Sequence, residues 1–144
     1  MTKLADAKAQ RVLQSFRAQN LMTQIGAEIT SLSRGQCEIS SPIPDNMRQQ
    51  HGFGHAALSF ALGDTAAGYA GLSVMPDDME VLTSEMKIQL LAPAQGKRLI
   101  ASGRVLKAGR RLVPAEADVW AEDDNGARVH IARLLGTMVP VAAT

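Results

Sequence analysis

One stretch of the sequence restricts the possible folds more than any other. Residues 56–72, AALSFALGDTAAGYAGL, contain no proline and are almost all apolar or small, and Asp64 is the single charged residue among them. A surface helix needs a polar face, which this stretch lacks. It therefore predicts a helix buried on every side, and a strongly curved antiparallel sheet is the element best suited to wrap it.

Alternating polar and apolar residues predict the strands of that sheet. Before the helix, residues 25–30 alternate, Ser33-Arg34-Gly35 turns the chain, and residues 36–43 complete a hairpin. Asp124-Asn125-Gly126 has the composition of a type I′ hairpin turn. Four alternating stretches after the helix predict an antiparallel meander: 80–91, 98–108, 112–122 and 128–139.

A further helix is predicted at residues 5–19, where Val12, Leu13 and Phe16 share one apolar face. No linker, repeat or shift in composition divides the 144 residues, and a domain of this length buries roughly two thirds of the surface of its unfolded chain. The expected fold class is therefore α+β, in a single domain over residues 1–144. Its parts are a long central helix, the curved antiparallel sheet around it, and an N-terminal helix.

Composition disfavours several functional classes. A net charge of +1 and five aromatic residues provide neither the basic surface nor the stacking platform of a nucleic-acid binder. No apolar run approaches the roughly 20 residues of a membrane helix, and the first residues lack an apolar signal segment. Cys37 is the only cysteine, which excludes an internal disulfide and a cysteine-rich zinc site. We expect a cytoplasmic protein that binds neither nucleic acid nor membranes.

The segment that enters the central helix, QQHGFGHAALSFALGD at residues 49–64, allows three interpretations. GFGHAA at residues 52–57 fits a relaxed dinucleotide-binding pattern, but a polar segment precedes it and antiparallel strands follow, which disfavours a Rossmann unit. His51 and His55 have the spacing of a metal-ligand pair, yet two glycines lie between them and no third ligand is near. Loop histidines are the favoured interpretation there, and no metal is expected. The third interpretation is a catalytic helix.

Both ends of this segment favour the catalytic interpretation. A buried, unpaired carboxylate is costly, so Asp64 indicates either a structural partner within the fold or a site that needs it. The first-turn amides of the helix point outward at the positive end of its dipole, and the small residues Ala56 and Ala57 let a carbonyl oxygen approach them. This arrangement predicts an oxyanion hole, with tight helix entry as the alternative.

The spacing of these two groups has a geometric consequence. His55 and Asp64 are nine residues apart, which is about 14 Å of rise and about 180° of rotation on an ideal helix. One helix therefore cannot present both ends to a single carbonyl group. If both functions are real, Asp64 of one protomer faces the helix start of another. The spacing then predicts a homodimer with active sites shared between protomers, or a dimer of two such dimers.

Two motifs resemble one protein family over nearly the whole chain. QQHGFGHAALSFALGDTAAGYA is similar to the histidine-glycine-glycine motif and acid-bearing helix of the hotdog-fold acyl-CoA thioesterases, in their phenylacetate-degradation (PaaI-like) branch. TSEMKIQLLAPAQG resembles the strand and turn that follow in that family. The order of helices and strands is similar as well. The resemblance implies a hotdog fold and hydrolysis of an acyl-CoA thioester without a cofactor.

The resemblance also implies roles for individual residues. Asp64 stands at the position of the catalytic carboxylate, as general base or nucleophile, and Ala56 at that of the residue whose amide binds the thioester oxygen. Gln49 replaces an asparagine that positions substrate or water. Thr83 matches a hydroxyl residue that orients water or the carboxylate from the partner side, and Ser84 is a second candidate for that task.

Two departures from the family pattern bear on the acyl group. Ala56-Ala57 replaces a pair of glycines, which retains the amides and adds two methyl groups beside the expected carbonyl position. Gln49 is one methylene longer than asparagine. Both changes leave the reaction class intact.

Coenzyme binding has two interpretations. Six basic residues lie within residues 97–111, and they either hold the phosphates of coenzyme A or form a solvated hairpin. Arg110 and Arg111, at the turn, are the expected phosphate contacts. The functional hypothesis is an acyl-CoA thioesterase. Its alternatives are a hydratase or dehydratase of the same fold, with His55 transferring protons, and a non-catalytic acyl-CoA-binding protein.

Overall fold

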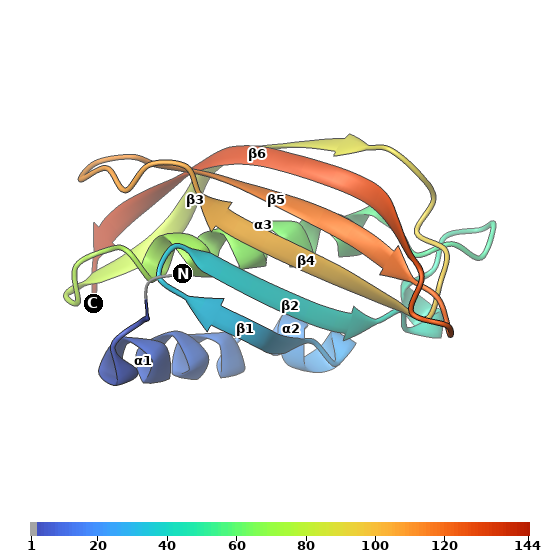
Figure 1. Cartoon of the computed structure of the whole chain (residues 1–144), viewed down its shortest axis with the longest axis horizontal. Coiled ribbons are helices and arrows are strands. Elements are labelled where there is room, and N and C mark those ends of the chain that lie inside the picture. Colours follow the sequence, from blue (N-terminus) through green and yellow to red (C-terminus); the bar gives the residue numbers. More distant parts are fainter. Residues whose placement is uncertain (1–2) are drawn as a thin grey trace.

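The structure is a computed structural model that describes residues 3–144. Figure 1 shows a curved sheet that passes over one long central helix, with two short helices along one edge. The helices are α1 (Asp6–Arg17), α2 (Asn20–Ile25), the 3-10 turn η1 (Asp45–Met47) and α3 (Ala56–Leu72). The strands are β1 (Glu28–Ser33), β2 (Gln36–Pro42), β3 (Met79–Leu90), β4 (Arg98–Val105), β5 (Val113–Glu122) and β6 (Arg128–Ala142).

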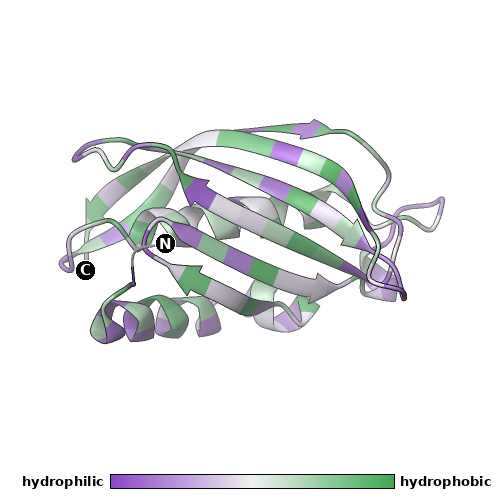
Figure 2. Ribbon diagram, viewed as in Figure 1, coloured by the Kyte–Doolittle hydropathy of each residue, from purple (hydrophilic) through white to green (hydrophobic). Residues whose placement is uncertain are grey.

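The six strands form one antiparallel sheet in the order β1-β2-β4-β5-β6-β3. Hydropathy alternates along the strands, as Figure 2 shows, because successive side chains point to opposite faces. On β5, for example, Ala115, Ala117 and Val119 are fully buried under α3. The predicted α+β fold, with a central helix, a wrapping sheet and an N-terminal helix, is confirmed.

Helix α3 spans the predicted residues 56–72, and small side chains determine how closely it packs. Ala66 and Ala67 are completely buried against the sheet. Gly103 of β4 lies directly over them: a methyl group added there would come within 2.3–2.5 Å of the helix backbone at Ala66 and Ala67. The absence of a side chain at Gly103 therefore allows the helix backbone to contact the strand.

The prediction that α3 is buried on every side is wrong for the isolated chain. One stripe of the helix faces away from the sheet, with helical spacing, at Ala57, Phe60, Ala61, Asp64 and Gly68. Phe60 is 36% exposed on this stripe. The sheet covers a single side of the helix, so an apolar stripe remains open beside the only charge of α3.

The predicted four-strand meander is also wrong. Strand β3 pairs with β6 at the far edge of the sheet, from Met79↔Ala142 to Leu90↔Ala132, and β4 pairs with β2 and β5. Alternation specifies which face of a strand is buried and carries no information about which strand lies beside it. Only β4, β5 and β6 follow one another as a meander.

Two local predictions also differ from the structure. The strand predicted from residue 25 begins at Glu28, because residues 20–25 form α2, in which Met22 and Ile25 are buried at helical spacing and Gly26 caps the helix at φ 73°. The turn between β5 and β6 is not type I′, which needs two residues with positive φ. Among residues 3–144 no residue other than glycine has positive φ, and only Gly126 does so in this turn. The Asp123 carboxylate accepts the amides of Asn125 and Ala127, each at 2.9 Å, and holds the turn instead.

Helix α1 is anchored to the segment that joins α3 to β3. The Lys8 ammonium donates to the Met75 carbonyl at 2.6 Å and pairs with Asp77 at 3.1 Å. Arg11 donates to the Met79 carbonyl and to Glu80. These contacts fix the start of β3, which carries Thr83. Among residues 3–144, no helix is long and apolar enough to cross a membrane.

Replacing Gly103 with alanine tests the close approach of α3 to the sheet. The added methyl group has no space, so we expect Gly103→Ala to lower the free energy of unfolding by about 1–3 kcal/mol, measured by urea denaturation. Ser102→Ala is the matched control, because Ser102 adjoins Gly103 on the same strand and its side chain points to the other face. An unchanged unfolding midpoint in Gly103→Ala contradicts the packing described.

Candidate active site

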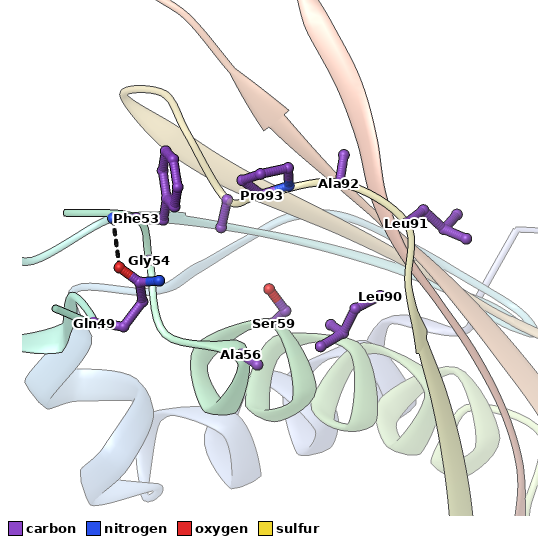
Figure 3. Close-up of a pocket in the computed structure, with 10 residues that line it drawn as sticks. Gln49, Phe53, Gly54, Ala56, Ser59, Leu90, Leu91, Ala92 and Pro93 are labelled. Carbon is purple, nitrogen blue, oxygen red and sulfur yellow. Dashed lines mark hydrogen bonds between the residues drawn. The ribbon is translucent and has the colours of Figure 1, made fainter. Parts of the chain in front are cut away.

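The loop that precedes α3 is closed by hydrogen bonds between its own residues. Gln49 holds this loop closed: its side-chain oxygen accepts the amides of His51 at 2.5 Å and Phe53 at 3.2 Å, the latter drawn in Figure 3. The Gly54 amide donates to the Ala94 carbonyl at 2.9 Å, which ties the loop to the segment after β3. With its oxygen occupied, Gln49 has its amide nitrogen available to a ligand.

At the start of α3, His55 acts as the helix N-cap. Its Nδ1 accepts the Ala57 amide at 2.9 Å, and its carbonyl accepts the Leu58 amide at 2.9 Å. The Ala56 amide donates to none of the residues that the structure describes. Sequence reasoning treats the first-turn amides as a group. In the structure the Ala56 N–H stays open at the positive end of the helix dipole, whereas the amides of His55 and Ala57 on either side of it both donate hydrogen bonds.

A cavity of about 470 Å³ adjoins this open amide. Its walls come from three segments: the loop at Gln49 and Phe53, the first turns of α3 at Ala56 and Ser59, and residues 90–94 after β3. Most of this lining is apolar. An acyl group whose carbonyl oxygen accepts the Ala56 amide has apolar contacts available here.

Asp64 lies two turns further along α3 and is half-buried. The Thr83 hydroxyl of β3 donates to its Oδ1 at 2.7 Å, within the same chain. Its Oδ2 accepts no hydrogen bond from the residues that the structure describes. Strand register between β3 and β6 shifts between Thr83 and Glu85, and a bulge of this kind redirects neighbouring side chains. The carboxylate is therefore oriented through one oxygen and open at the other.

A second, smaller cavity of about 240 Å³ surrounds Asp64. Its lining is polar and includes Ser15, Gln19, Tyr69 and Thr83. The Tyr69 hydroxyl accepts from the Gln19 amide at 2.8 Å and lies 3.0 Å from the Ser15 hydroxyl. Burial raises the pKa of Tyr69 above its ordinary value, so this hydroxyl keeps its proton at neutral pH. A polar cavity beside an open carboxylate oxygen is suited to hold water.

The two cavities share no lining residue. Ala56 and Asp64 are eight residues apart on one straight helix, which is about 12 Å of rise. The open amide and the open carboxylate oxygen therefore cannot act on the same carbonyl group from one chain. Each chain carries the open amide and the open carboxylate oxygen at different places along α3.

The remaining predicted residues have separate positions. Ser84 is exposed at the bulge, unpaired in the ladder. Arg110 and Arg111 are exposed in the β4–β5 loop, which Figure 1 places at the end of the molecule away from the start of α3. The six basic residues do not act as one group, because Arg104 pairs with Glu116 and Asp118 on the sheet.

Two other chemistries are poorly supported by the described residues. Within residues 3–144, no three His, Cys, Asp or Glu side chains come together as a metal site requires. His51 is exposed in the loop, and Nδ1 of His55 is occupied by its capping role. Burial raises the pKa of the Cys37 thiol to about 12, so it stays protonated at neutral pH and is a poor nucleophile.

Sequence reasoning missed part of the two cavities. Ser59 follows Ala56 by three residues, which places both on one face of α3, and this spacing was the available signal. Tyr69 and Gln19 meet only because α1 packs beside α3, and residues 90–94 reach the cavity through their bridge to the loop at Gly54. No local pattern in the sequence indicates these long-range contacts.

Comparison with known proteins gives one family match. The model of the thioesterase superfamily matches residues 51–127, which include the start of α3, Asp64 and Thr83. Among curated proteins, a Saccharolobus solfataricus protein that carries the name of an esterase is 27% identical over 124 residues, covering 86% of this chain and 79% of that protein.

Solved structures give a closer correspondence. The crystal structure of a thioesterase family protein from Silicibacter pomeroyi superposes with a TM-score of 0.91 at 37% identity, covering 94% of this chain and 99% of that one. The PaaI protein of the Escherichia coli phenylacetic acid degradation operon has a TM-score of 0.84 at 20% identity, covering 99% of each chain. The likeness to PaaI is one of fold.

Proposed function

The chain belongs to the thioesterase superfamily and is a thioester hydrolase, and on that basis we propose that it hydrolyses acyl-CoA thioesters to a free acid and coenzyme A. The observation that carries the proposal is the open Ala56 amide beside the apolar cavity. As a thioester is attacked, negative charge develops on its carbonyl oxygen. An amide fixed at a helix N-terminus stabilises that charge without having to reorganise.

Asp64 is the proposed catalytic carboxylate. Acting as general base, its open Oδ2 takes a proton from water while the water oxygen bonds to the carbonyl carbon. The carbon–sulfur bond then breaks, and the thiolate of coenzyme A leaves and is protonated. Acting as nucleophile, the same oxygen attacks the carbonyl carbon, the carbon–sulfur bond breaks and the thiolate of coenzyme A leaves; water then hydrolyses the resulting anhydride to the free acid and restores the carboxylate. The Thr83 hydrogen bond at 2.7 Å supports both roles, because it orients the carboxylate.

A second copy of the chain is the proposed source of the missing half-site. Strand β3 is twelve residues long and lies at one edge of the sheet, with most of its residues exposed or half-buried in the isolated chain. A long edge strand tends to pair with another strand. The open stripe of α3 includes Phe60 beside Asp64. These surfaces support a homodimer that covers the stripe and brings Asp64 of one protomer to Ala56 of the other, alone or within a dimer of dimers.

Arg110 and Arg111 are the proposed contacts for the coenzyme phosphates. Both are exposed, whereas Arg98 donates to Ser40 and Arg104 is held by two carboxylates. Their loop lies away from the start of α3 in the same chain (Figure 1), so in this proposal they serve the site whose Ala56 comes from the partner.

The first prediction for this function concerns Asp64. Asp64→Asn retains the shape of the side chain and removes its basicity and nucleophilicity, so we expect the rate of thiol release from acyl-CoA to fall at least ~10²-fold. The assay follows free thiol across short, branched, long and aromatic acyl-CoAs. Asp78→Asn is the matched control, an exposed acid close to the start of β3, and should leave the rate unchanged.

The outcome of that assay also separates the alternatives. Unchanged turnover in Asp64→Asn removes Asp64 from the mechanism. Binding of acyl-CoA without thiol release by the wild-type protein favours a non-catalytic binder. Loss of an enoyl-CoA chromophore with the thioester intact favours a hydratase.

The second prediction concerns the coenzyme. Replacing both Arg110 and Arg111 with alanine should raise KM for an acyl-CoA more than KM for the corresponding acyl thioester of N-acetylcysteamine, because the short thioester lacks the phosphates. Each arginine–phosphate contact is a charge-assisted hydrogen bond, so we expect a KM increase of roughly tenfold or more for acyl-CoA. Equal effects on both substrates would remove the two arginines from coenzyme binding.

A further inference from the structure

Ser59 is a buried hydroxyl for which the fold provides no partner. The residue is 1% exposed, and its side chain makes no hydrogen bond to any of the residues that the structure describes. The other two buried serines in residues 3–144 are satisfied. Ser73 donates to the Ala70 carbonyl at 2.6 Å and accepts the Gly35 amide at 2.7 Å, and Ser41 donates to the Ile25 carbonyl at 3.2 Å.

The unpaired hydroxyl lies beside the cavity at the start of α3. Ser59 is a lining residue of that cavity, and Figure 3 shows its oxygen directed into the space between the loop and residues 90–94. Side chains on a helix point back towards its N-terminus, so a residue three positions after Ala56 lies on the same face, towards the open amide. The distance between the two residues along the helix axis is about 4.5 Å.

The Ser59 oxygen faces the cavity, where water or a ligand can supply the hydrogen bond that the protein does not. A ligand that displaces the water without replacing that hydrogen bond loses affinity. The surrounding walls at Phe53, Leu90, Leu91 and Pro93 offer apolar contact only. Besides Gln49 at the loop and the Ala56 amide, the cavity offers the Ser59 hydroxyl as a polar group, a short way beyond the place where the thioester oxygen is proposed to bind.

We propose that Ser59 determines substrate specificity, by hydrogen bonding to an oxygen on the third carbon of the acyl group. The inference rests on the proposed function, because it takes the Ala56 amide as the carbonyl site. From there the third carbon of an acyl chain, entering the cavity, comes close to the Ser59 hydroxyl. The substrate class is then 3-hydroxyacyl or 3-oxoacyl thioesters, whose remaining carbons contact the apolar walls.

A site built to pair a substrate oxygen discriminates strongly against the analogue that lacks it, since the hydroxyl of the protein then stays unpaired. We expect wild-type kcat/KM to be roughly tenfold or more higher for 3-hydroxybutyryl-CoA than for butyryl-CoA. The two substrates share the coenzyme, the chain length and the reacting carbonyl group. Their ratio therefore reports the contact with the third carbon.

The test compares this ratio in the wild-type protein and in Ser59→Ala. The inference predicts that Ser59→Ala lowers the ratio to about one, and that Ser59→Cys, with a weaker donor of similar size, gives an intermediate ratio. Thermal unfolding provides a second readout. Removing an unpaired buried hydroxyl from a helix should leave the melting temperature of Ser59→Ala unchanged or raise it, whereas a structural hydrogen bond would make it fall. Ser102→Ala, on the outer face of the sheet, should keep the wild-type ratio.

Three results overturn the inference. They are a wild-type ratio near one, a ratio that Ser59→Ala leaves unchanged, and a lower melting temperature in Ser59→Ala. If one of these three results is found while acyl-CoA is still hydrolysed, the proposed function stands and only the role of Ser59 fails. If the wild-type protein releases thiol from no acyl-CoA, the proposed function and the role of Ser59 fail together.

Discussion

The contact between α3 and the sheet determines the positions of the Ala56 amide and the Asp64 carboxylate. Because Gly103 has no side chain, the backbone of α3 can contact strand β4, and Ala66 and Ala67 are buried at this contact. Interiors packed this closely transmit small displacements, so the helix cannot shift along the sheet without a steric clash. A rigid α3 holds the Ala56 amide against one cavity and the Asp64 carboxylate against another.

This rigidity explains why, in the proposed mechanism, one chain carries two half-sites. About 12 Å of helix separates Ala56 from Asp64, so the two groups of one chain cannot meet at one carbonyl group. Thr83 orients Asp64 within its own chain, at 2.7 Å, so the carboxylate is prepared before any partner arrives. The open stripe of α3 and the edge strand β3 lie beside that carboxylate. In the proposed dimer, the surfaces that associate are therefore next to the groups that react.

Sequence patterns predicted the parts of this structure that depend on local chemistry. The apolar composition of residues 56–72 predicted the bounds of α3, and the alternation of polar and apolar residues predicted the strands, because both patterns follow directly from burial. The pairing of β3 with β6 depends on contacts between distant segments, and so do the Tyr69–Gln19 contact and the cavity wall at residues 90–94. Ala56 and Asp64 were identifiable because a helix has a fixed rise and an unpaired start. The spacing of Ser59 from Ala56 is visible in the sequence, but the absence of a hydrogen-bond partner for its hydroxyl is visible only in the folded chain.

The most direct test of the account is recovery of activity in mixed dimers. One protomer carries Asp64→Asn and the other carries Ala56→Trp, which blocks the open amide; each variant alone should be inactive. When the two are unfolded together and refolded at equal amounts, half of the dimers are mixed, and each mixed dimer has one intact site. The account predicts about a quarter of wild-type thiol release. No recovery, in mixtures shown by mass spectrometry to contain the mixed dimer, would contradict an active site shared between two chains.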